Sequence, residues 1–174
     1  MYSGGTIGMK NTSRGYAPAK GYLTEFVRIL PMFHDSSAEH LIPKDMWVDK
    51  DLCGVPCISP LNDEHDERTA YRFLEYDPLL DSSNVEFEHW QRMAQDIVDN
   101  YEYYDAFVVL HGTDTMGFTS SALSFMLENL TKTIVVTGSQ IPLSRPRNDG
   151  LMNLLGALQI SSHYKIPEVV VYFS

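Results

Sequence analysis

The sequence predicts an α/β fold: a three-layer α/β/α domain with an open, mostly parallel sheet. Short valine-rich runs recur in the second half of the 174-residue chain, at Ala106–Leu110, Thr133–Thr137 and 168–173. Such runs are typical of strands buried on both faces of a parallel sheet. Segments of helical period separate them, and this alternation implies crossovers that cover both faces with helices.

The first half of the chain predicts a helix, a strand and a long loop. Residues 23–30 are apolar at helical spacing, and residues 71–77 predict a weaker strand. Between them, residues 36–69 show no sustained period, so we expect an acidic, partly ordered loop insertion there. Cys53 and Cys57 are expected to be unlinked thiols in this loop, because a structural zinc site would need a second pair of ligands.

Three further helices are expected in the second half. Ser83 with Glu86 could form a capping box before the first, Thr119 could cap the second, and the third begins near Asp149. The apolar side chains that mark these helices are Trp90, Met93, Ala94, Ile97, Val98 and Tyr101, then Leu123, Met126, Leu127 and Leu130, then Leu151, Leu154, Leu155 and Leu158.

Composition and charge exclude several classes of protein. The chain is 44% hydrophobic, which excludes a disordered chain. Its 13 basic and 23 acidic residues give a net charge of −10, so it lacks the electrostatic footprint of a nucleic-acid or anionic-membrane binder. No apolar run approaches the roughly 20 residues of a membrane helix, and the N-terminus does not resemble a secretory signal. We therefore expect a cytoplasmic protein.

Segments rich in glycine and hydroxyl groups follow the expected strands. In an open parallel sheet, ligands bind beyond the carboxyl ends of the strands. Three such segments are 80–84 (LDSSN), 111–117 (HGTDTMG) and 138–143 (GSQIPL), and the N-terminal segment 3–9 (SGGTIGM) has the same character. Because these segments share one composition at one edge of the sheet, we expect a binding site there.

Two of these segments offer nucleophilic and charged groups. Gly4 and Gly5 permit close backbone approach beside Thr6, so Thr6 could be a nucleophile with backbone N–H groups near a developing oxyanion. The alternative is a glycine turn at a frayed terminus. Asp114 could hold a substrate ammonium group while Thr113 helps to deliver a water, although an aspartate at a strand end is also a common cap or turn former.

The remaining candidates have plain structural alternatives. Asp81, Ser82 and Ser83 could supply hydroxyls and backbone donors to a carboxylate, but Ser83 serves equally well as a helix N-cap. His111 could be a general base, yet its place at the end of an apolar strand favours a structural histidine. The motifs G-x-S-x-G, G-x-G-x-x-G and the Walker loop are absent from the sequence, so serine-hydrolase and nucleotide-binding functions have little support.

These motifs resemble a known family. Residues 3–9 and 111–116 (HGTDTM) resemble the two signature motifs of bacterial-type L-asparaginases. The long shared blocks resemble the cytoplasmic, type I branch, which includes animal proteins also named lysophospholipases. The resemblance covers nearly the whole chain except about residues 36–69. The further matching blocks are 30–35, 78–84, 123–130, 135–143 and 148–158.

The resemblance implies hydrolysis of L-asparagine to aspartate and ammonia. Thr6 matches the nucleophile, which would form a β-aspartyl acyl-enzyme, and Thr113 matches the second catalytic threonine. Tyr16, in RGYAP, matches the tyrosine of a mobile lid. Asp114 matches the carboxylate that binds the substrate α-ammonium group. The segment that binds the substrate α-carboxylate is matched by Asp81, Ser82 and Ser83.

The resemblance also bears on cofactors, partners and completeness. It implies no metal or organic cofactor. It implies that the full-length protein is a homodimer or homotetramer and that it binds a small-molecule substrate. Because Met1 lies five residues before Thr6, we expect the family's strand before that turn to be missing. We likewise expect the family's catalytic lysine and C-terminal domain to be missing. Residues 1–174 are then an N-terminal domain that is incomplete at both ends and inactive alone.

Three alternative functions stay open at this point. The chain could belong to a related amidase, such as the glutaminase subunit of a tRNA-dependent amidotransferase. It could instead be a non-catalytic segment that binds asparagine or a partner chain. A lysophospholipase, named for animal relatives, has no motif in its favour.

Overall fold

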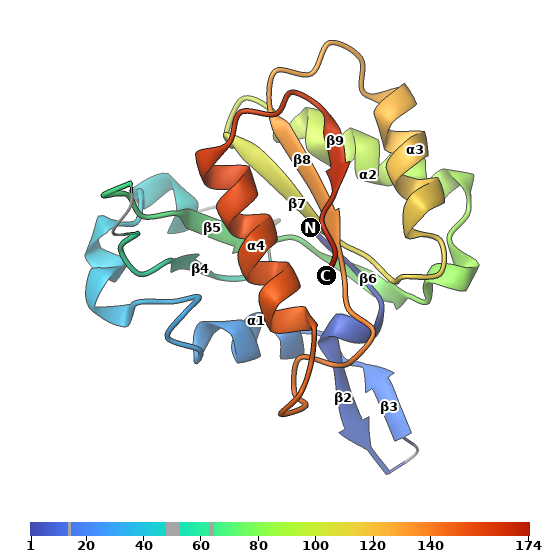
Figure 1. Ribbon diagram of the computed structural model, residues 1–174, viewed down its shortest axis with the longest axis horizontal. Coiled ribbons are helices and arrows are strands. Elements are labelled where there is room, and N and C mark those ends of the chain that lie inside the picture. Colours follow the sequence, from blue (N-terminus) through green and yellow to red (C-terminus); the bar gives the residue numbers. More distant parts are fainter. Residues whose placement is uncertain (14, 48–52, 63–64) are drawn as a thin grey trace.

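The computed structural model describes residues 1–13, 15–47, 53–62 and 65–174. Among these residues a five-stranded sheet lies at the centre of the molecule, with helices on both faces (Figure 1). Its strands pair in parallel, which confirms the predicted α/β class. Their order is β6 (Glu75–Leu80), β1 (Tyr2–Gly4), β7 (Ala106–Leu110), β8 (Thr133–Thr137) and β9 (Val169–Val171).

Strand β1 corrects the prediction that no strand precedes the glycine–threonine turn. It lies between β6 and β7 and is only three residues long. The Tyr2 N–H donates to the Leu74 carbonyl at 2.7 Å, and the Leu110 N–H donates to the Met1 carbonyl at 2.8 Å. The Tyr2 side chain is fully buried. Hydrogen bonds from both neighbours and this buried ring hold a strand too short to show a sequence pattern of its own.

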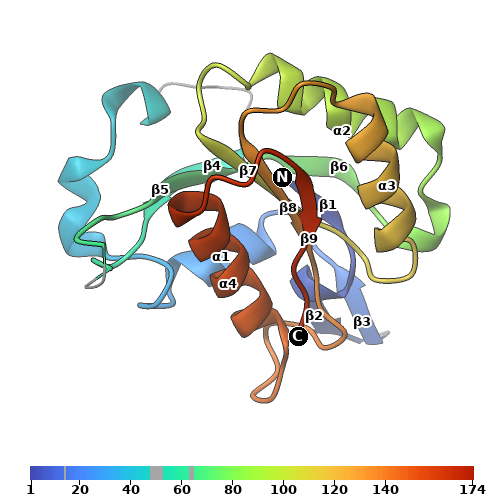
Figure 2. The same cartoon turned by 45° about the horizontal axis from the view of Figure 1, so that its top comes forward.

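Two apolar cores lie on opposite faces of the sheet. Helices α2 (Phe87–Asp99) and α3 (Met116–Met126) cover one face, and α1 (Tyr22–Arg28) and α4 (Gly150–His163) cover the other (Figure 2). Because side chains alternate along each strand, Val109 packs with α2 and α3 while its neighbour Leu110 packs with α1 and α4. The predicted helices therefore exist near their expected positions.

Two predicted helix caps are wrong. The N-cap of α2 is Glu86, which forms a capping box with His89 rather than with Ser83. Ser83 lies earlier, in a 3-10 turn over Ser82–Asn84. Thr119 does not begin α3 but lies inside it, because its buried hydroxyl bonds to neighbouring side chains instead of backbone.

The segment predicted as a loop insertion contains regular structure. It has 3-10 turns at Ser36–Leu41 and Lys44–Trp47 and a strand, β4 (Cys53–Ile58). Strand β4 pairs antiparallel with β5 (Ala70–Phe73), so the strand predicted over residues 71–77 is in fact divided between β5 and β6. Cys57 is a free, buried thiol in β4 rather than in a loop, and the side chain of Cys53 lies outside the described residues.

A second hairpin projects from the body of the molecule. After a 3-10 turn over Thr6–Gly8, strands β2 (Met9–Thr12) and β3 (Gly15–Pro18) pair antiparallel (Figure 1). No strands were predicted for this segment. Only Tyr16, which lies on β3, was expected to belong to a lid.

Candidate active site

Backbone packing between glycines gathers the predicted loops at the carboxyl edge of the sheet. Gly4 and Gly5 have positive φ angles of 135° and 86°. A Cβ atom on Gly5 would lie 2.6 Å from the Gly112 Cα, and one on Gly4 would collide with the backbone of Leu80. No other residue could adopt these angles at this distance from neighbouring backbone. The turn that carries Thr6 therefore lies directly against the loops after β6 and β7.

Gly112 continues this stack to the loop after β6. A Cβ atom on Gly112 would lie 2.5 Å from the Ser82 Cβ. The Thr115 hydroxyl also donates to the Ser82 carbonyl at 2.7 Å. The structure thus brings three segments to one place, as expected for loops that follow the carboxyl ends of parallel strands. They are the segment of Thr6, the segment of Asp81 to Ser83, and the segment of Thr113 and Asp114.

The loop after β8 reaches the same place. The Leu143 N–H donates to the Ile7 carbonyl at 3.1 Å, directly after Thr6. Gly138 packs against the His111 carbonyl so closely that a side chain would collide with it. All four segments singled out by composition therefore lie at one edge of the sheet.

Three of the predicted side chains at this edge are available to a ligand. Within the described part of the chain, Thr6, Thr113 and Asp114 make no side-chain hydrogen bond or ion pair. Asp114 is exposed, and the two threonines are half-buried. Two hydroxyls and one carboxylate without protein partners are suited to bind a small polar molecule that carries an amine.

Asp81 has a different environment. Its Oδ1 accepts hydrogen bonds from the Ser83 N–H at 3.0 Å and from the Ser83 hydroxyl at 2.8 Å. These two bonds lower the pKa of Asp81, so the carboxylate stays ionised. Ser82 is 5% exposed beneath this turn. Asp81 therefore fixes the turn, and the exposed Ser83 is the member of the segment that faces solvent.

His111 is a structural histidine, as its strand position favours. It is 1% exposed, and its Nδ1 lies 2.7 Å from the Gly112 carbonyl, which can only accept. Nε2 must then accept from the Thr119 hydroxyl at 2.9 Å, and that hydroxyl accepts from the Trp90 indole at 2.9 Å. Burial lowers the pKa of His111, and the bond to Gly112 opposes this only in part. A neutral imidazole thus holds the loop of Thr113.

Tyr16 does not bond to Thr6 in this structure. It is 40% exposed on β3, and its hydroxyl accepts from Arg145 Nη1 at 3.0 Å. Arg145 lies in the loop after β8, and sequence reasoning missed it. Its position two residues beyond the segment 138–143 was the available signal.

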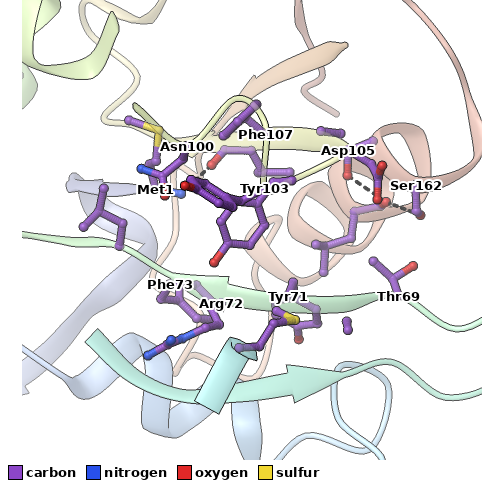
Figure 3. A pocket seen from close by; sticks show the side chains of 18 of the residues that line it. Met1, Thr69, Tyr71, Arg72, Phe73, Asn100, Tyr103, Asp105, Phe107 and Ser162 are labelled. Carbon is purple, nitrogen blue, oxygen red and sulfur yellow. Dashed lines mark hydrogen bonds between the residues drawn. The ribbon is translucent and has the colours of Figure 1, made fainter. Parts of the chain in front are cut away.

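A cavity among the described residues lies elsewhere. It has a volume of about 600 Å³ and lies at the amino end of β7, lined by Met1, Tyr103 and Phe107 among others (Figure 3). None of the predicted site residues lines it. Burial lowers the pKa of the Met1 ammonium group from 8.0 to about 5, against an opposing effect of Asp96. The unbonded groups at the carboxyl edge are therefore the better candidate site.

Over residues 1–13, 15–47, 53–62 and 65–174, no cluster of three or more His, Cys, Asp or Glu side chains is arranged to hold a metal ion. In the same part of the chain, no helix is both long and apolar enough to cross a membrane.

Comparison with known proteins identifies the family. Residues 1–174 match the family model described as asparaginase, N-terminal. The chain belongs to the asparaginase family. The match runs through residues 36–69, so the expectation that the resemblance leaves this segment out is wrong.

Individual relatives agree with this assignment. The chain is 45% identical over 174 residues to an L-asparaginase of Dirofilaria immitis, covering 100% of this chain and 28% of that protein. It is 44% identical over 173 residues to the human 60 kDa lysophospholipase, covering 99% and 28%. L-asparaginase I from Vibrio cholerae superposes with a TM-score of 0.71 at 40% identity, covering 99% and 43%. The chain thus spans less than half the length of these relatives.

Proposed function

We propose that the protein hydrolyses the side-chain amide of L-asparagine to aspartate and ammonia. The observation that carries this proposal is the stack of Gly5 on Gly112 and of Gly112 on Ser82, which brings together the segments that contain Thr6, Thr113 and Asp114. The side chains of these three residues make no hydrogen bond or ion pair within the described part of the chain. Names of relatives supply the substrate, since two of the three compared are L-asparaginases.

In the proposed first step, the Thr6 hydroxyl attacks the amide carbon. The C–N bond breaks, the hydroxyl proton goes to the departing nitrogen, and ammonia leaves a β-aspartyl ester on Thr6. In the second step, water attacks the ester carbon beside Thr113, the ester C–O bond breaks, and a proton returns to the Thr6 oxygen. Two easier steps thus replace one difficult hydrolysis.

Polar groups at the carboxyl edge suit the ammonium and carboxylate groups of an amino acid. The exposed, unpaired Asp114 carboxylate would bind the α-ammonium group. The α-carboxylate would meet hydroxyl and backbone donors of Ser82 and Ser83. Asp81, whose carboxylate is already bonded to Ser83, would fix this segment rather than touch the anion. Tyr16 would act as a lid residue, and no metal or organic cofactor takes part.

The proposal extends to the binding partners of the protein and to its cellular location. The substrate is a small molecule, and neither nucleic acid nor membrane is involved, in keeping with the net charge of −10. The assembled protein would be a homodimer or homotetramer in the cytoplasm.

Ammonia release from L-asparagine tests the proposal on the full-length protein, because residues 1–174 span less than half the length of the compared relatives and are expected to be inactive alone. We expect Thr6→Ala to abolish release and Thr6→Ser to retain part of it, because serine keeps a nucleophilic oxygen. The matched control is Ser124→Ala, an exposed hydroxyl on α3, which should leave release unchanged. Undiminished release by Thr6→Ala would overturn the proposed nucleophile, and calorimetric binding of asparagine without any release would favour a non-catalytic binding role.

The name of the human relative favours one second candidate, lysophospholipid hydrolysis. Fatty-acid release from lysophosphatidylcholine, measured on the same preparation, separates it from the first. Release of fatty acid without ammonia would favour this candidate over the amidase.

A further inference from the structure

The β2–β3 hairpin and the loop after β8 extend from the same end of the molecule (Figures 1 and 2). One pair of side chains joins them near the middle of the hairpin. Arg145 Nη1 donates to the Tyr16 hydroxyl at 3.0 Å, and the Arg145 guanidinium carbon lies 5.9 Å from the centre of the Tyr16 ring. Arg145 thus binds the same side chain by a hydrogen bond and by a cation–π contact. A longer bond of 3.4 Å joins Ser144 to Met9 at the hairpin base.

Arg145 lies in a turn that several hydrogen bonds stabilise. Its N–H donates to the Pro142 carbonyl at 2.9 Å, and its carbonyl accepts from the Asn148 side chain at 2.6 Å. Asn148 in turn accepts from the Leu151 N–H of α4 at 2.9 Å. Further along this loop, Asp149 accepts from two backbone N–H groups, at 2.7 and 2.9 Å. The backbone of Arg145 is therefore tied to the first turn of α4.

The hairpin that carries Tyr16 is held less firmly. A two-stranded hairpin is marginally stable alone, and Lys10, Asn11 and Tyr16 are exposed on this one. The segment following it is anchored by an exposed ion pair between Lys20 and Asp77. The hairpin also contacts α1, where Lys10 Nζ lies 5.8 Å from the centre of the Tyr22 ring. Of the two partners, Tyr16 thus lies on the more exposed element, and Arg145 lies on the element with more hydrogen bonds to the body of the molecule.

We infer that Arg145 is a positioning residue that holds the Tyr16 hairpin closed beside the turn of Thr6. Arginine suits this task because its planar group can donate to the hydroxyl and contact the ring at once, which the point charge of lysine cannot do equally well. The contact itself is independent of the reaction. Its consequence for catalysis rests on the proposed function, because only then does Tyr16 act beside a nucleophile.

Amide hydrogen exchange of the ligand-free protein tests the contact directly. We expect Arg145→Gln to speed exchange of the β2–β3 ladder amides about fivefold, because the closed hairpin loses its charged partner. Arg145→Lys should fall between this variant and the parent. The matched control is Arg147→Gln, an exposed arginine two residues away, which should exchange like the parent. The β4–β5 hairpin serves as an internal reference and should not change.

A double-mutant cycle shows whether Tyr16 is the partner. If it is, Arg145→Gln should have much less effect in a Tyr16→Phe background, where the hydroxyl is gone. Equal effects in both backgrounds, unchanged exchange in Arg145→Gln, or faster exchange throughout the sheet would each overturn the inference.

Kinetics separate this inference from the proposed function. If the protein releases ammonia, Arg145→Gln should raise KM for asparagine and lower kcat/KM, with partial rescue by Arg145→Lys. Coupled exchange without any ammonia release would support the contact and contradict the function. Ammonia release with no coupling would do the reverse.

Discussion

The two edges of the central sheet differ in how they are filled. At the carboxyl edge, Gly5 packs on Gly112 and Gly112 packs on Ser82 without room for a side chain on either glycine. The segments packed together in this way carry hydroxyls and a carboxylate that make no side-chain hydrogen bond within the described part of the chain. At the amino edge lies a cavity of about 600 Å³ beside the buried Met1 nitrogen. None of the predicted catalytic residues lines this cavity. A cavity alone is therefore a weaker indication of the candidate site than close backbone packing beneath unpaired polar groups.

The largest expected effect tests the packing at the carboxyl edge. Gly5→Ala should lower the free energy of unfolding by about 3–5 kcal/mol, because the new Cβ meets Gly112 backbone and the φ angle of 86° is strained. Gly117→Ala is the control, since no atom lies within 4 Å of its ideal Cβ and the residue is helical. It should gain about 0.5–1 kcal/mol in urea denaturation. Equal stabilities would contradict the packing argument.

The second effect tests the amino edge through pH. The pKa of the Met1 ammonium group falls from 8.0 to about 5 on folding, so between these values the unfolded chain binds more protons. Stability should therefore rise from pH 5 to pH 8, by about 2–3 kcal/mol from this group. An acetylated N-terminus should lose that part of the slope, and an unchanged slope after acetylation would rule out this source.

The third effect tests the histidine beneath the site. His111→Ala leaves the Gly112 carbonyl and the Thr119 hydroxyl without their partner, so we expect a loss of about 2 kcal/mol in the free energy of unfolding. His40→Ala, at an exposed position, should cost less than about 0.5 kcal/mol. Because burial lowers the pKa of His111, the parent should lose stability as pH falls below about 6.5, and His111→Ala should lose less. An identical slope in both proteins would show that His111 is not buried as a neutral ring.

The smallest effect concerns the turn of Asp81. Asp81→Ala removes an acceptor from Ser83, and we expect a cost of about 0.5–1 kcal/mol, typical of a lost cap. The lowered pKa of Asp81 means that its contribution is present at neutral pH and is lost as pH falls through the folded pKa. Urea denaturation at pH 7 and pH 3 measures this, and a cost that is larger at pH 3 would contradict it.

The sequence predicted the parts of the fold that have strong local patterns. The strands β7 and β8 were found because strands buried on both faces are continuously apolar. Strand β1 was missed because its three residues are held by Leu74 and Leu110, which lie far away in the chain. The cap at Thr119 was wrong for a similar reason, since its hydroxyl bonds to His111 and Trp90, which belong to other elements.

The same division applies to the candidate site. Its four loops could be predicted, because composition marks them and the carboxyl ends of parallel strands share an edge. The contacts between these loops could not be predicted, because the approach of Gly5 to Gly112 depends on the register of the two strands that precede them. The pairing of Tyr16 with Arg145 joins side chains 129 residues apart, and no local pattern encodes it.

Identification of an acyl-enzyme at Thr6 is the decisive test of the proposed nucleophile. The protein would be mixed with L-asparagine, quenched in acid within the first turnover, digested and examined by peptide mass spectrometry. We expect a β-aspartyl ester on Thr6 that is absent from Thr6→Ala and disappears as free aspartate forms. An adduct on a different residue, or ammonia release by Thr6→Ala at the parent rate, would contradict it.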